Sequence, residues 1–352
     1  MAHPPELWLF DDAPILGGAE TFALRLARSL IEHGSARARI VCPDGTEMAR
    51  RCAAEGIEHV ALTFPPLLPT SAPRWPGGVL RTRLVLQRAG SETVAIGNTA
   101  RAQAYLTAAA LTFRRRPRII QLIHDQHTIG RRSGRFAFRR VGALVAVGSS
   151  VADACRRVLP TVPIHQTNLF LEPEDVPSAP PRPAGARPAV GVLTRLIPEK
   201  GVLEMVDELA GVDSWSSARI AGPAQDPSYA EHVRRRIQSL GLQNRIRLIG
   251  EVRDLRSFFG AVDILIVPST GTEGQGFAIV EALWHDRPCL VRRSALSAGD
   301  FSGLPVLPFE DSGELDRGLR ELPGQVVPAD VVRRRFGAEQ ALDVIMHAAR
   351  RS

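Results

Sequence analysis

The chain has 352 residues and a mass of 38.2 kDa, a length that predicts two domains at roughly 150 residues each. A hydrophobic fraction of 44% and a mean hydropathy of −0.03 are typical of a globular protein with a large core, and they exclude the disordered and fibrous classes. The formal net charge at pH 7 is +7, from 44 lysines and arginines against 37 acidic residues.

Membrane-spanning, secreted and disulfide- or zinc-stabilised proteins are not expected. No apolar run approaches the ~18 residues of a membrane span. The start, Met1 to Pro5, has no basic segment followed by an apolar one, so we expect no signal peptide and a cytoplasmic location. The cysteines form no C-x-x-C pair, which argues against a structural zinc site or a disulfide framework.

Apolar strand-like segments alternate with amphipathic helix-like segments through the first half of the chain. A strand at 7–13 is followed by Gly17-Gly18 and by a helix at 19–33, whose apolar residues recur at helical spacing. Further strands are expected at 39–42, 59–64, 93–96, 118–124, 143–147 and 164–168. This alternation predicts a mainly parallel sheet with helices on both faces.

A stretch rich in Pro, Ala and Gly at 173–188 interrupts this pattern and predicts a stiff linker. The alternation then restarts, with strands expected at 189–194, 218–221, 246–250, 264–267, 288–291 and 305–307, helices at 229–240 and 277–285, and a final helix at 329–350. The sequence therefore predicts an α/β fold of two Rossmann-like, doubly wound domains at 1–172 and 189–328. The segment 329–352 is expected to be a crossover helix that returns to the first domain.

The positive charge is concentrated in one region. Residues 71–140 hold fourteen arginines and two acidic residues, a net charge of +12, so the rest of the chain nets −5. Three interpretations stay open: a solvated basic face, a patch that contacts anionic lipid head groups, and a nucleic-acid surface. Phe136 and Phe138 beside arginines favour the lipid surface. The absence of a recognised binding motif disfavours nucleic acid.

The first candidate site is a glycine-rich loop between a buried strand and a helix, from Ser269 to Glu281. In an open parallel sheet, ligands bind beyond the carboxyl ends of the strands. Gly274 and Gly276 let backbone amides approach a ligand, and the following helix N-terminus favours phosphate. Glu273 and Glu281 would lie roughly 10–12 Å apart, which suits hydroxyls at two ends of an elongated ligand better than a glycosidase carboxylate pair. A turn with two surface glutamates gives the same pattern.

The second candidate is a basic turn from Thr194 to Gly201, directly after the first strand of the second half. A departing pyrophosphate must be neutralised by a metal ion or by fixed cations. Arg195 offers a forked donor set, and Lys200, the one lysine in the sequence, is a compact point charge. The chain has no D-x-D pair of the kind that holds a metal ion. An ordinary β–α turn in an arginine-rich protein is the alternative.

These motifs resemble glycosyltransferase family 4, whose members are retaining enzymes of the GT-B fold. The Glu-x7-Glu element from Glu273 to Glu281 matches the family's signature, and the turn from Arg195 to Gly201 matches its donor-phosphate loop. Gly17-Gly18-Ala19-Glu20 matches its N-terminal glycine loop. The resemblance covers nearly the whole chain. It implies two domains that face each other across a cleft, with a nucleotide-sugar donor held by the C-terminal domain.

The resemblance also implies a role for each matching residue. Arg195 and Lys200 would hold the donor diphosphate, Glu273 would contact the donor sugar, and Glu281 would bind the ribose. Gly250 and Val252 would lie against the base, and the remaining donor contacts would come from Gly17, Gly18, Gly274, Gln275, Gly276 and Phe277. No metal ion or other cofactor is expected.

His124 ends the strand expected at 118–124 and so emerges at the ligand edge of the first sheet. The resemblance places the family's active-site histidine here, and the neighbouring Asp125 could orient it. A satisfied histidine at a strand end gives the same pattern, as does a chance H-x-x-H with His127.

The sequence therefore predicts a metal-independent retaining glycosyltransferase that moves a sugar from a nucleotide-diphosphate sugar to an acceptor hydroxyl. We expect it to act in bacterial surface polysaccharide, lipopolysaccharide or glycolipid synthesis, in the cytoplasm or on the inner face of the membrane. The acceptor is expected to be a sugar, a lipid-linked compound or a soluble small molecule. A sugar-nucleotide epimerase and a non-catalytic binding protein on the same fold are alternatives.

Overall fold

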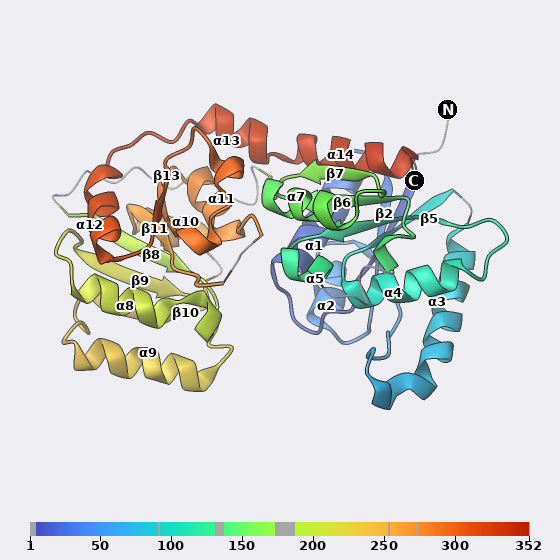
Figure 1. The fold of residues 1–352 in the computed structure, drawn as a ribbon, viewed down its shortest axis with the longest axis horizontal. Coiled ribbons are helices and arrows are strands. Elements are labelled where there is room, and N and C mark those ends of the chain that lie inside the picture. The colour runs from blue at the N-terminus through green and yellow to red at the C-terminus, as the bar shows by residue number, and fades with distance from the viewer. Residues whose placement is uncertain are drawn as a thin grey trace. The chain divides into compact units, whose positions relative to one another are not determined.

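The computed structural model describes residues 5–90, 92–130, 137–172, 187–252, 254–271 and 274–351. The chain divides into two compact units, of which the first comprises Met1–Phe170 with Ala338–Ser352 and the second Leu171–Gly337 (Figure 1). Residues 173–186, which hold most of the expected linker, lie outside the described residues.

The first unit contains a seven-stranded parallel sheet among its described residues, in the order β3-β2-β1-β4-β5-β6-β7. Its strands are β1 (Glu6–Phe10), β2 (Arg37–Cys42), β3 (Glu58–Ala61), β4 (Thr93–Gly97), β5 (Arg118–Ile123), β6 (Ala143–Val147) and β7 (Ile164–Thr167). Its helices are α1 (Gly18–Glu32), α2 (Glu47–Ala54), η1 (Pro69–Arg74), α3 (Trp75–Ala89), α4 (Ala100–Ala110), α5 (Gln126–Gly130), α7 (Ser149–Val158) and α14 (Ala338–Arg351).

The described part of the second unit contains a six-stranded parallel sheet in the order β10-β9-β8-β11-β12-β13. Its strands are β8 (Ala189–Leu193), β9 (Ser217–Ala221), β10 (Ile246–Gly250), β11 (Ile264–Val267), β12 (Cys289–Arg292) and β13 (Val306–Phe309). Its helices are η3 (Pro198–Lys200), α8 (Val202–Ala210), α9 (Pro227–Ser239), α10 (Leu255–Gly260), α11 (Phe277–Trp284), η4 (Arg293–Ala295), η5 (Ala298–Phe301), α12 (Ser312–Glu321) and α13 (Ala329–Phe336). The predicted fold class of two Rossmann-like parallel-sheet domains is confirmed.

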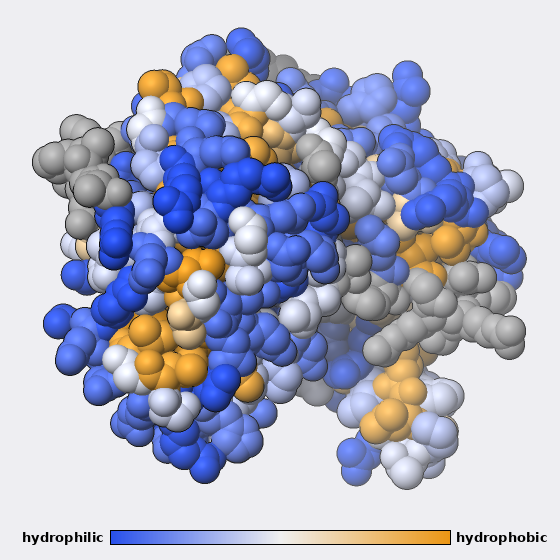
Figure 2. All heavy atoms as spheres, turned by 60° about the vertical axis from the view of Figure 1, so that its left-hand side comes forward, coloured by the Kyte–Doolittle hydropathy of each residue, from blue (hydrophilic) through white to orange (hydrophobic). Residues whose placement is uncertain are grey.

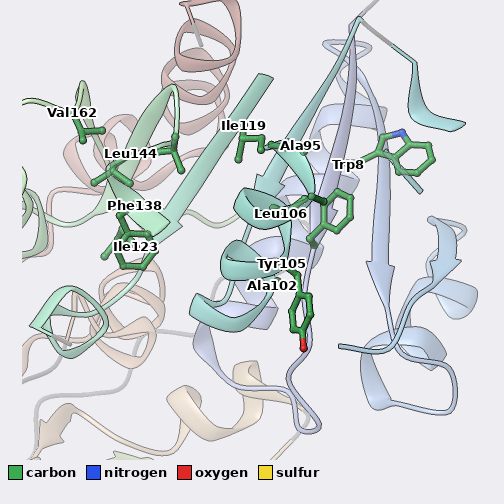
Figure 3. Close-up of a cluster of buried hydrophobic side chains, with 14 of the residues drawn as sticks. Trp8, Ala95, Ala102, Tyr105, Leu106, Ile119, Ile123, Phe138, Leu144 and Val162 are labelled. Carbon is green, nitrogen blue, oxygen red and sulfur yellow. The ribbon is translucent and has the colours of Figure 1, made fainter. Parts of the chain in front are cut away.

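The central strands are apolar on both faces because helices cover both sides of each sheet (Figure 1). In β1, Trp8 and Phe10 belong to one hydrophobic cluster with residues of α3 and α4. The alternate residues Leu7 and Leu9 are fully buried outside that cluster. Figure 3 shows the cluster between strands and helices of the first unit. Burial on both faces explains why these strands appear as short continuous apolar runs in the sequence.

Each sheet has a point where the strand order reverses. In the first unit this point lies between β1 and β4, and in the second it lies between β8 and β11. At such a point the loops that follow the two strands leave toward opposite faces of the sheet and open a crevice at its carboxyl edge. Ligand-binding loops are therefore expected after β1 and β4, and after β8 and β11.

The suggestion that Phe138 presents an apolar side chain to a lipid surface is wrong. Phe138 has 0% of its side chain exposed and packs in the hydrophobic cluster with Ile123 and Leu144 (Figure 3). Burial of the large aromatic ring is favoured over its exposure beside the arginines. Phe136 lies outside the described residues.

The single C-terminal helix expected at 329–350 is instead two helices, α13 and α14. The break falls at Gly337, whose backbone is extended, with φ −81° and ψ 160°. The Leu171 amide donates to the Phe336 carbonyl at 2.8 Å, and Leu171 forms a parallel bridge with Gly337. This pairing provides a partner for a backbone group at the end of α13, so the helix ends there. The second helix, α14, packs on β5, β6, β7 and α1 of the first unit.

Candidate active site

Two loops of the second unit, one after β8 and one after β11, are joined through a single carbonyl group. The Glu199 carbonyl accepts hydrogen bonds from the amides of Thr270 at 3.1 Å and Gly271 at 3.4 Å. Glu199 and Thr270 are 71 residues apart in sequence, yet their loops meet at the point where the strand order reverses. The structure therefore brings together the two motifs that the sequence singles out.

Close backbone packing fixes the relative position of these loops. Gly201 has φ +63°, and a Cβ atom there would lie 2.1 Å from the Pro268 carbonyl oxygen. The same oxygen accepts a hydrogen bond from Arg292 Nε at 3.0 Å, and Arg292 also donates to both carboxylate oxygens of Glu208 at 2.9 and 2.8 Å. The nearly buried Arg292 therefore holds the start of the glycine-rich loop from below. Sequence reasoning missed this arginine because nothing local distinguishes it from the many others.

The predicted cations lie on this joined pair of loops. Arg195 is exposed, and its guanidinium donates to Gln225 Oε1 at 2.9 Å. Lys200 is half-buried and ends η3, directly before Gly201. Gly222 brings a third loop against the basic turn, since a Cβ atom there would lie 1.8 Å from the Thr194 carbonyl oxygen. Gly222 and Gln225 were not predicted, although a glycine directly after a strand is the kind of signal that marks such a loop.

The glycine-rich loop leads into α11 as predicted. Gly276 has φ +78° and caps the helix N-terminus, a backbone conformation that favours glycine. Gln275 is buried, whereas Gly274, Phe277 and Glu281 are partly exposed. A helix N-terminus at the same sheet edge as Arg195 and Lys200 is chemically suited to an anion such as a diphosphate. Glu273 lies outside the described residues, so its predicted contact with the donor sugar stays a prediction.

The predicted base-contacting segment follows β10. Gly250 has φ +73°, and its carbonyl accepts from the Gly222 amide at 2.8 Å. Val252 is partly exposed, two residues further on. These contacts put the segment beside the loop that packs on the basic turn. The proposed contact with a nucleotide base stays a prediction.

In the first unit, the loop after β1 runs into α1 through Gly17 and Gly18. The Gly17 amide donates to Glu20 Oε2 at 2.7 Å, and a Cβ atom on Gly17 would lie only 2.9 Å from that oxygen. The space beside Glu20, and not the backbone conformation, therefore favours glycine at position 17. Its φ of −120° is open to any residue. The Glu20 carboxylate satisfies an amide at the N-terminus of α1.

A chain of hydrogen bonds joins the carboxyl ends of three neighbouring strands in the first unit. Asp11 follows β1, Asn98 follows β4 and His124 follows β5. The Asn98 side-chain amide donates to Asp11 Oδ2 at 2.6 Å, and His124 Nε2 lies 2.8 Å from Asn98 Oδ1. The predicted active-site histidine is thus half-buried at the sheet edge, and two polar residues that sequence reasoning missed connect to it.

Burial shifts the protonation of both ends of this chain. It raises the pKa of the Asp11 carboxyl to about 7, against the opposing effect of the hydrogen bond from Asn98. It also lowers the pKa of His124 to about 4, so this imidazole is neutral near pH 7. The neighbouring Asp12 has other partners than Asp11. It accepts a hydrogen bond from Thr99 and forms an ion pair with Arg101 at 2.7 Å.

Asp125 does not orient His124 by a hydrogen bond. Its carboxylate instead accepts from the Thr128 amide at 2.8 Å and from the Thr128 hydroxyl at 3.0 Å. An aspartate that precedes a helical turn commonly binds amides of that turn, and this local contact takes precedence here. The charge of Asp125 still acts on His124, since it raises the pKa that burial lowers.

Metal-ligating residues are dispersed in the part of the chain that the structure describes. No group of three or more His, Cys, Asp or Glu side chains there could hold a metal ion. In the same residues, no helix is both long and apolar enough to cross a membrane.

Residues 187–321 match the family model described as glycosyl transferases group 1. The match lies within the second unit. Both the basic turn and the glycine-rich loop lie within the matched residues. In sequence, the chain is 29% identical over 190 residues to LpsB of Rhizobium meliloti (strain 1021), a lipopolysaccharide core biosynthesis mannosyltransferase. That alignment spans 51% of this chain and 52% of LpsB, about half the length of each.

The fold is shared with solved glycosyltransferases along the whole chain. HepE from Anabaena, in complex with UDP and glucose, has a TM-score of 0.80 at 18% identity and covers 97% of this chain and 98% of its own. A glycosyltransferase from Rickettsia africae ESF-5 has a TM-score of 0.82 at 15% identity and covers 99% and 98%. The two Rossmann-like units therefore have the GT-B fold.

Replacement of Gly201 by alanine is expected to destabilise the joined loops of the second unit. A left-handed backbone conformation alone costs a non-glycine residue about 1 kcal/mol. At Gly201 the new Cβ atom also meets the Pro268 carbonyl oxygen. Gly241→Ala is the matched control, because Gly241 has φ +70° with no atom within 4 Å of the added Cβ. Denaturant unfolding should show a clearly larger loss for Gly201→Ala than for Gly241→Ala, and equal losses would contradict the close packing.

Proposed function

We propose that the protein is a retaining, metal-independent glycosyltransferase that uses a nucleotide-diphosphate sugar. The observation that carries this proposal is the junction at the Glu199 carbonyl, which unites the basic turn and the glycine-rich loop within the residues that match the family model. Two cations and the N-terminus of α11 then lie at one edge of one sheet. That arrangement suits the diphosphate of a sugar nucleotide.

The donor is proposed to bind with its diphosphate on Arg195, Lys200 and the amides that begin α11. Glu281, partly exposed in the first two turns of α11, is in reach of the ribose in this arrangement, and Gly250 to Val252 would lie against the base. Glu273 would contact the sugar hydroxyls. HepE, which shares the fold, was solved with UDP and with UDP-glucose, and this supports a nucleotide sugar as the ligand class.

In the proposed reaction, the bond between the anomeric carbon and the donor phosphate oxygen breaks. The acceptor oxygen bonds to the same face of that carbon, and the acceptor proton passes to an oxygen of the departing diphosphate. Negative charge accumulates on the diphosphate, so fixed positive groups around it lower the barrier. Arg195 and Lys200 would supply these charges in place of a metal ion.

The acceptor is proposed to be a growing surface glycan, in lipopolysaccharide or related envelope synthesis. Support comes from LpsB, whose activity lies in lipopolysaccharide core biosynthesis. A soluble small-molecule acceptor, a sugar-nucleotide epimerase and a non-catalytic binding protein are the alternatives.

Ligand binding and product analysis distinguish these activities. Thermal unfolding is measured with UDP, GDP, ADP and TDP and their common sugars, each with and without EDTA. We expect one nucleotide to stabilise the protein by about 2.7 kcal/mol at 100 times its Kd, with no effect of EDTA. That donor should release its nucleotide diphosphate and yield a glycoside when an acceptor glycan is added. An isomeric sugar nucleotide formed without acceptor would indicate an epimerase, and binding without turnover would indicate a binding protein.

Replacement of Lys200 by alanine tests the assignment of the diphosphate site. Removal of one transition-state charge contact lowers turnover by about 10²–10³-fold in comparable sites. We expect a loss of that size in kcat/KM for the sugar nucleotide, together with weaker binding of the nucleotide diphosphate. Arg235→Ala on α9 is the control, because it removes an exposed basic side chain elsewhere in the same unit. Activity of Lys200→Ala close to that of the control would overturn the assignment.

We also propose that the first unit binds an anionic membrane surface through η1 and α3. Five exposed leucines gather on these elements, the preceding segment and the end of α4: Leu67, Leu68, Leu80, Leu84 and Leu111, which are 45–57% exposed. Figure 2 shows apolar residues on the lobe that η1 and the start of α3 form. A groove of about 630 Å³ beside them is lined by Trp75, Pro76, Val79 and Leu80 among others.

Exposed arginines lie on the same elements as these leucines. The exposed ones on η1, α3 and the segment after α4 are Arg74, Arg81, Arg88, Arg114, Arg115 and Arg116. Apolar side chains bordered by cations are complementary to the acyl chains and the anionic head groups of a bilayer, and each cation near such a surface contributes about 1 kcal/mol. An envelope glycan carried on a lipid would be met at such a surface.

Vesicle sedimentation tests the membrane proposal. We expect the protein to sediment with vesicles of phosphatidylcholine that contain 30% phosphatidylglycerol, and to remain in the supernatant with pure phosphatidylcholine or in high salt. The double variant Leu80→Glu/Leu84→Glu should lose this binding. Val326→Glu in the second unit, at a residue that is 85% exposed, is the control for loss of an exposed apolar side chain. Equal sedimentation of the double variant and the control would contradict the proposal.

A further inference from the structure

The hydrogen bonds among Asp11, Asn98 and His124 have a direction that the surrounding groups determine. The Asn98 side-chain nitrogen lies 2.6 Å from Asp11 Oδ2 and 3.2 Å from the Ala19 carbonyl oxygen. A carbonyl oxygen accepts and never donates, so the NH₂ group of Asn98 must face Ala19 and Asp11. Its Oδ1 atom therefore faces His124 and can only accept. It follows that His124 Nε2, 2.8 Å away, carries the proton.

The ring of His124 is held in this orientation by packing as well. Phe22 of α1 meets it edge-on, with ring centroids 5.3 Å apart, and packs in the same way on Phe170. The backbone before Asn98 is closely packed, because a Cβ atom on Gly97 would lie 2.2 Å from Gln121 Oε1 and 2.4 Å from Gln103 Oε1. The strand end that carries Asn98 is therefore closely packed, and Asn98 itself is 4% exposed.

We propose that Asp11 and Asn98 are positioning residues that hold His124 in its Nε2–H tautomer and so leave Nδ1 as a hydrogen-bond acceptor at the ligand edge of the first sheet. The structure gives Nδ1 no hydrogen-bond partner among the described residues, and the residue is only partly buried at the ligand edge of the sheet. The substrate class rests on the proposed function. The tautomer of His124 does not rest on the proposed function, because it follows from the hydrogen bond between the Asn98 amide and the Ala19 carbonyl.

This assignment gives His124 a defined chemical role. A neutral imidazole with a bare Nδ1 accepts a hydroxyl proton in a hydrogen bond and does not act as a cation toward the diphosphate. Burial keeps the pKa of His124 at about 4, which agrees with this neutral role. A hydroxyl that donates to Nδ1 would be oriented by the strand ends of the first unit.

Nitrogen NMR of protein labelled in histidine tests the tautomer directly. The His124 signals are assigned by their loss in His124→Gln. At pH 7 we expect a protonated Nε2 and an unprotonated Nδ1 in the wild-type protein. Asn98→Asp places a carboxylate against Nε2–H, so the pKa of His124 should rise in that variant. A protonated Nδ1 in the wild-type protein would overturn the proposal, whether or not the protein has transferase activity.

Kinetics of the same variants test the positioning role. Loss of a residue that orients a site ligand costs about 10–100-fold in comparable sites. We expect a loss of that size in kcat/KM for the sugar nucleotide in Asn98→Asp, with unchanged affinity for the nucleotide diphosphate alone. Asn244→Asp, at an exposed position of the second unit, is the matched control. Unchanged kcat/KM in Asn98→Asp would overturn the positioning role.

The pH profile provides a third readout. The pKa of Asp11 is raised to about 7 by burial, with the charges of Glu20 and Asp12 acting in the same direction. Among the neighbouring charges, Asp125 raises the pKa of His124 and Arg101 lowers that of Asp12. The charge of Asp11 also raises the pKa of Cys42 on β2. Ionised Asp11 is the stronger acceptor for Asn98, so kcat/KM should rise as pH increases through 7. Asp11→Asn keeps an acceptor oxygen and should remove this step, whereas Asp153→Asn on α7 should retain it. A step that persists in Asp11→Asn would contradict the role of Asp11.

Discussion

The close approach of two loops at the reversal point of the second sheet is the constraint on which the candidate site depends. Strands β8 and β11 are neighbours, so the loops that follow them start side by side although they are far apart in the sequence. Gly201 permits contact with the Pro268 carbonyl because it lacks a Cβ atom, and the Glu199 carbonyl binds the start of the glycine-rich loop. Arg292 supports the start of that loop by its hydrogen bond to the Pro268 carbonyl, and it is itself paired with the partly buried Glu208. The basic turn and the start of the glycine-rich loop are thereby held together at one edge of the sheet.

In the first unit, the constraint at the point where the strand order reverses is the burial of polar side chains. Three polar side chains follow three apolar strands, and each would be costly to bury without a partner. They partner one another in a chain from Asp11 through Asn98 to His124. The cost of burial appears as a raised pKa for Asp11 and a lowered pKa for His124. Such a chain has one stable direction because the Ala19 carbonyl accepts from the central amide.

Buried polar groups and exposed apolar side chains lie on different elements of the first unit. The carboxyl edge of its sheet carries buried polar groups, and η1 with α3 carries exposed leucines among arginines. Phe138, which lies near other arginines in the sequence, packs inside the core instead. Proximity of apolar and basic residues along the chain therefore does not identify a surface. One face of α3 packs on α4. Leu80 and Leu84, which are not on that face, are therefore left exposed.

The sequence by itself determined the strands, the fold class and the two donor-loop motifs. Each of these depends on local spacing: apolar runs bounded by glycines and prolines, a glycine-rich turn before a helix, and the one lysine after a strand. It could not identify Asp11, Asn98, Gly222 or Arg292, because their roles arise from strand order and from atoms far away in the chain. It also gave one C-terminal helix where Leu171 pairs with Gly337 and breaks it into two. Tertiary structure decided which polar groups meet, since hydrogen-bond partners at a sheet edge are set by which strands are neighbours.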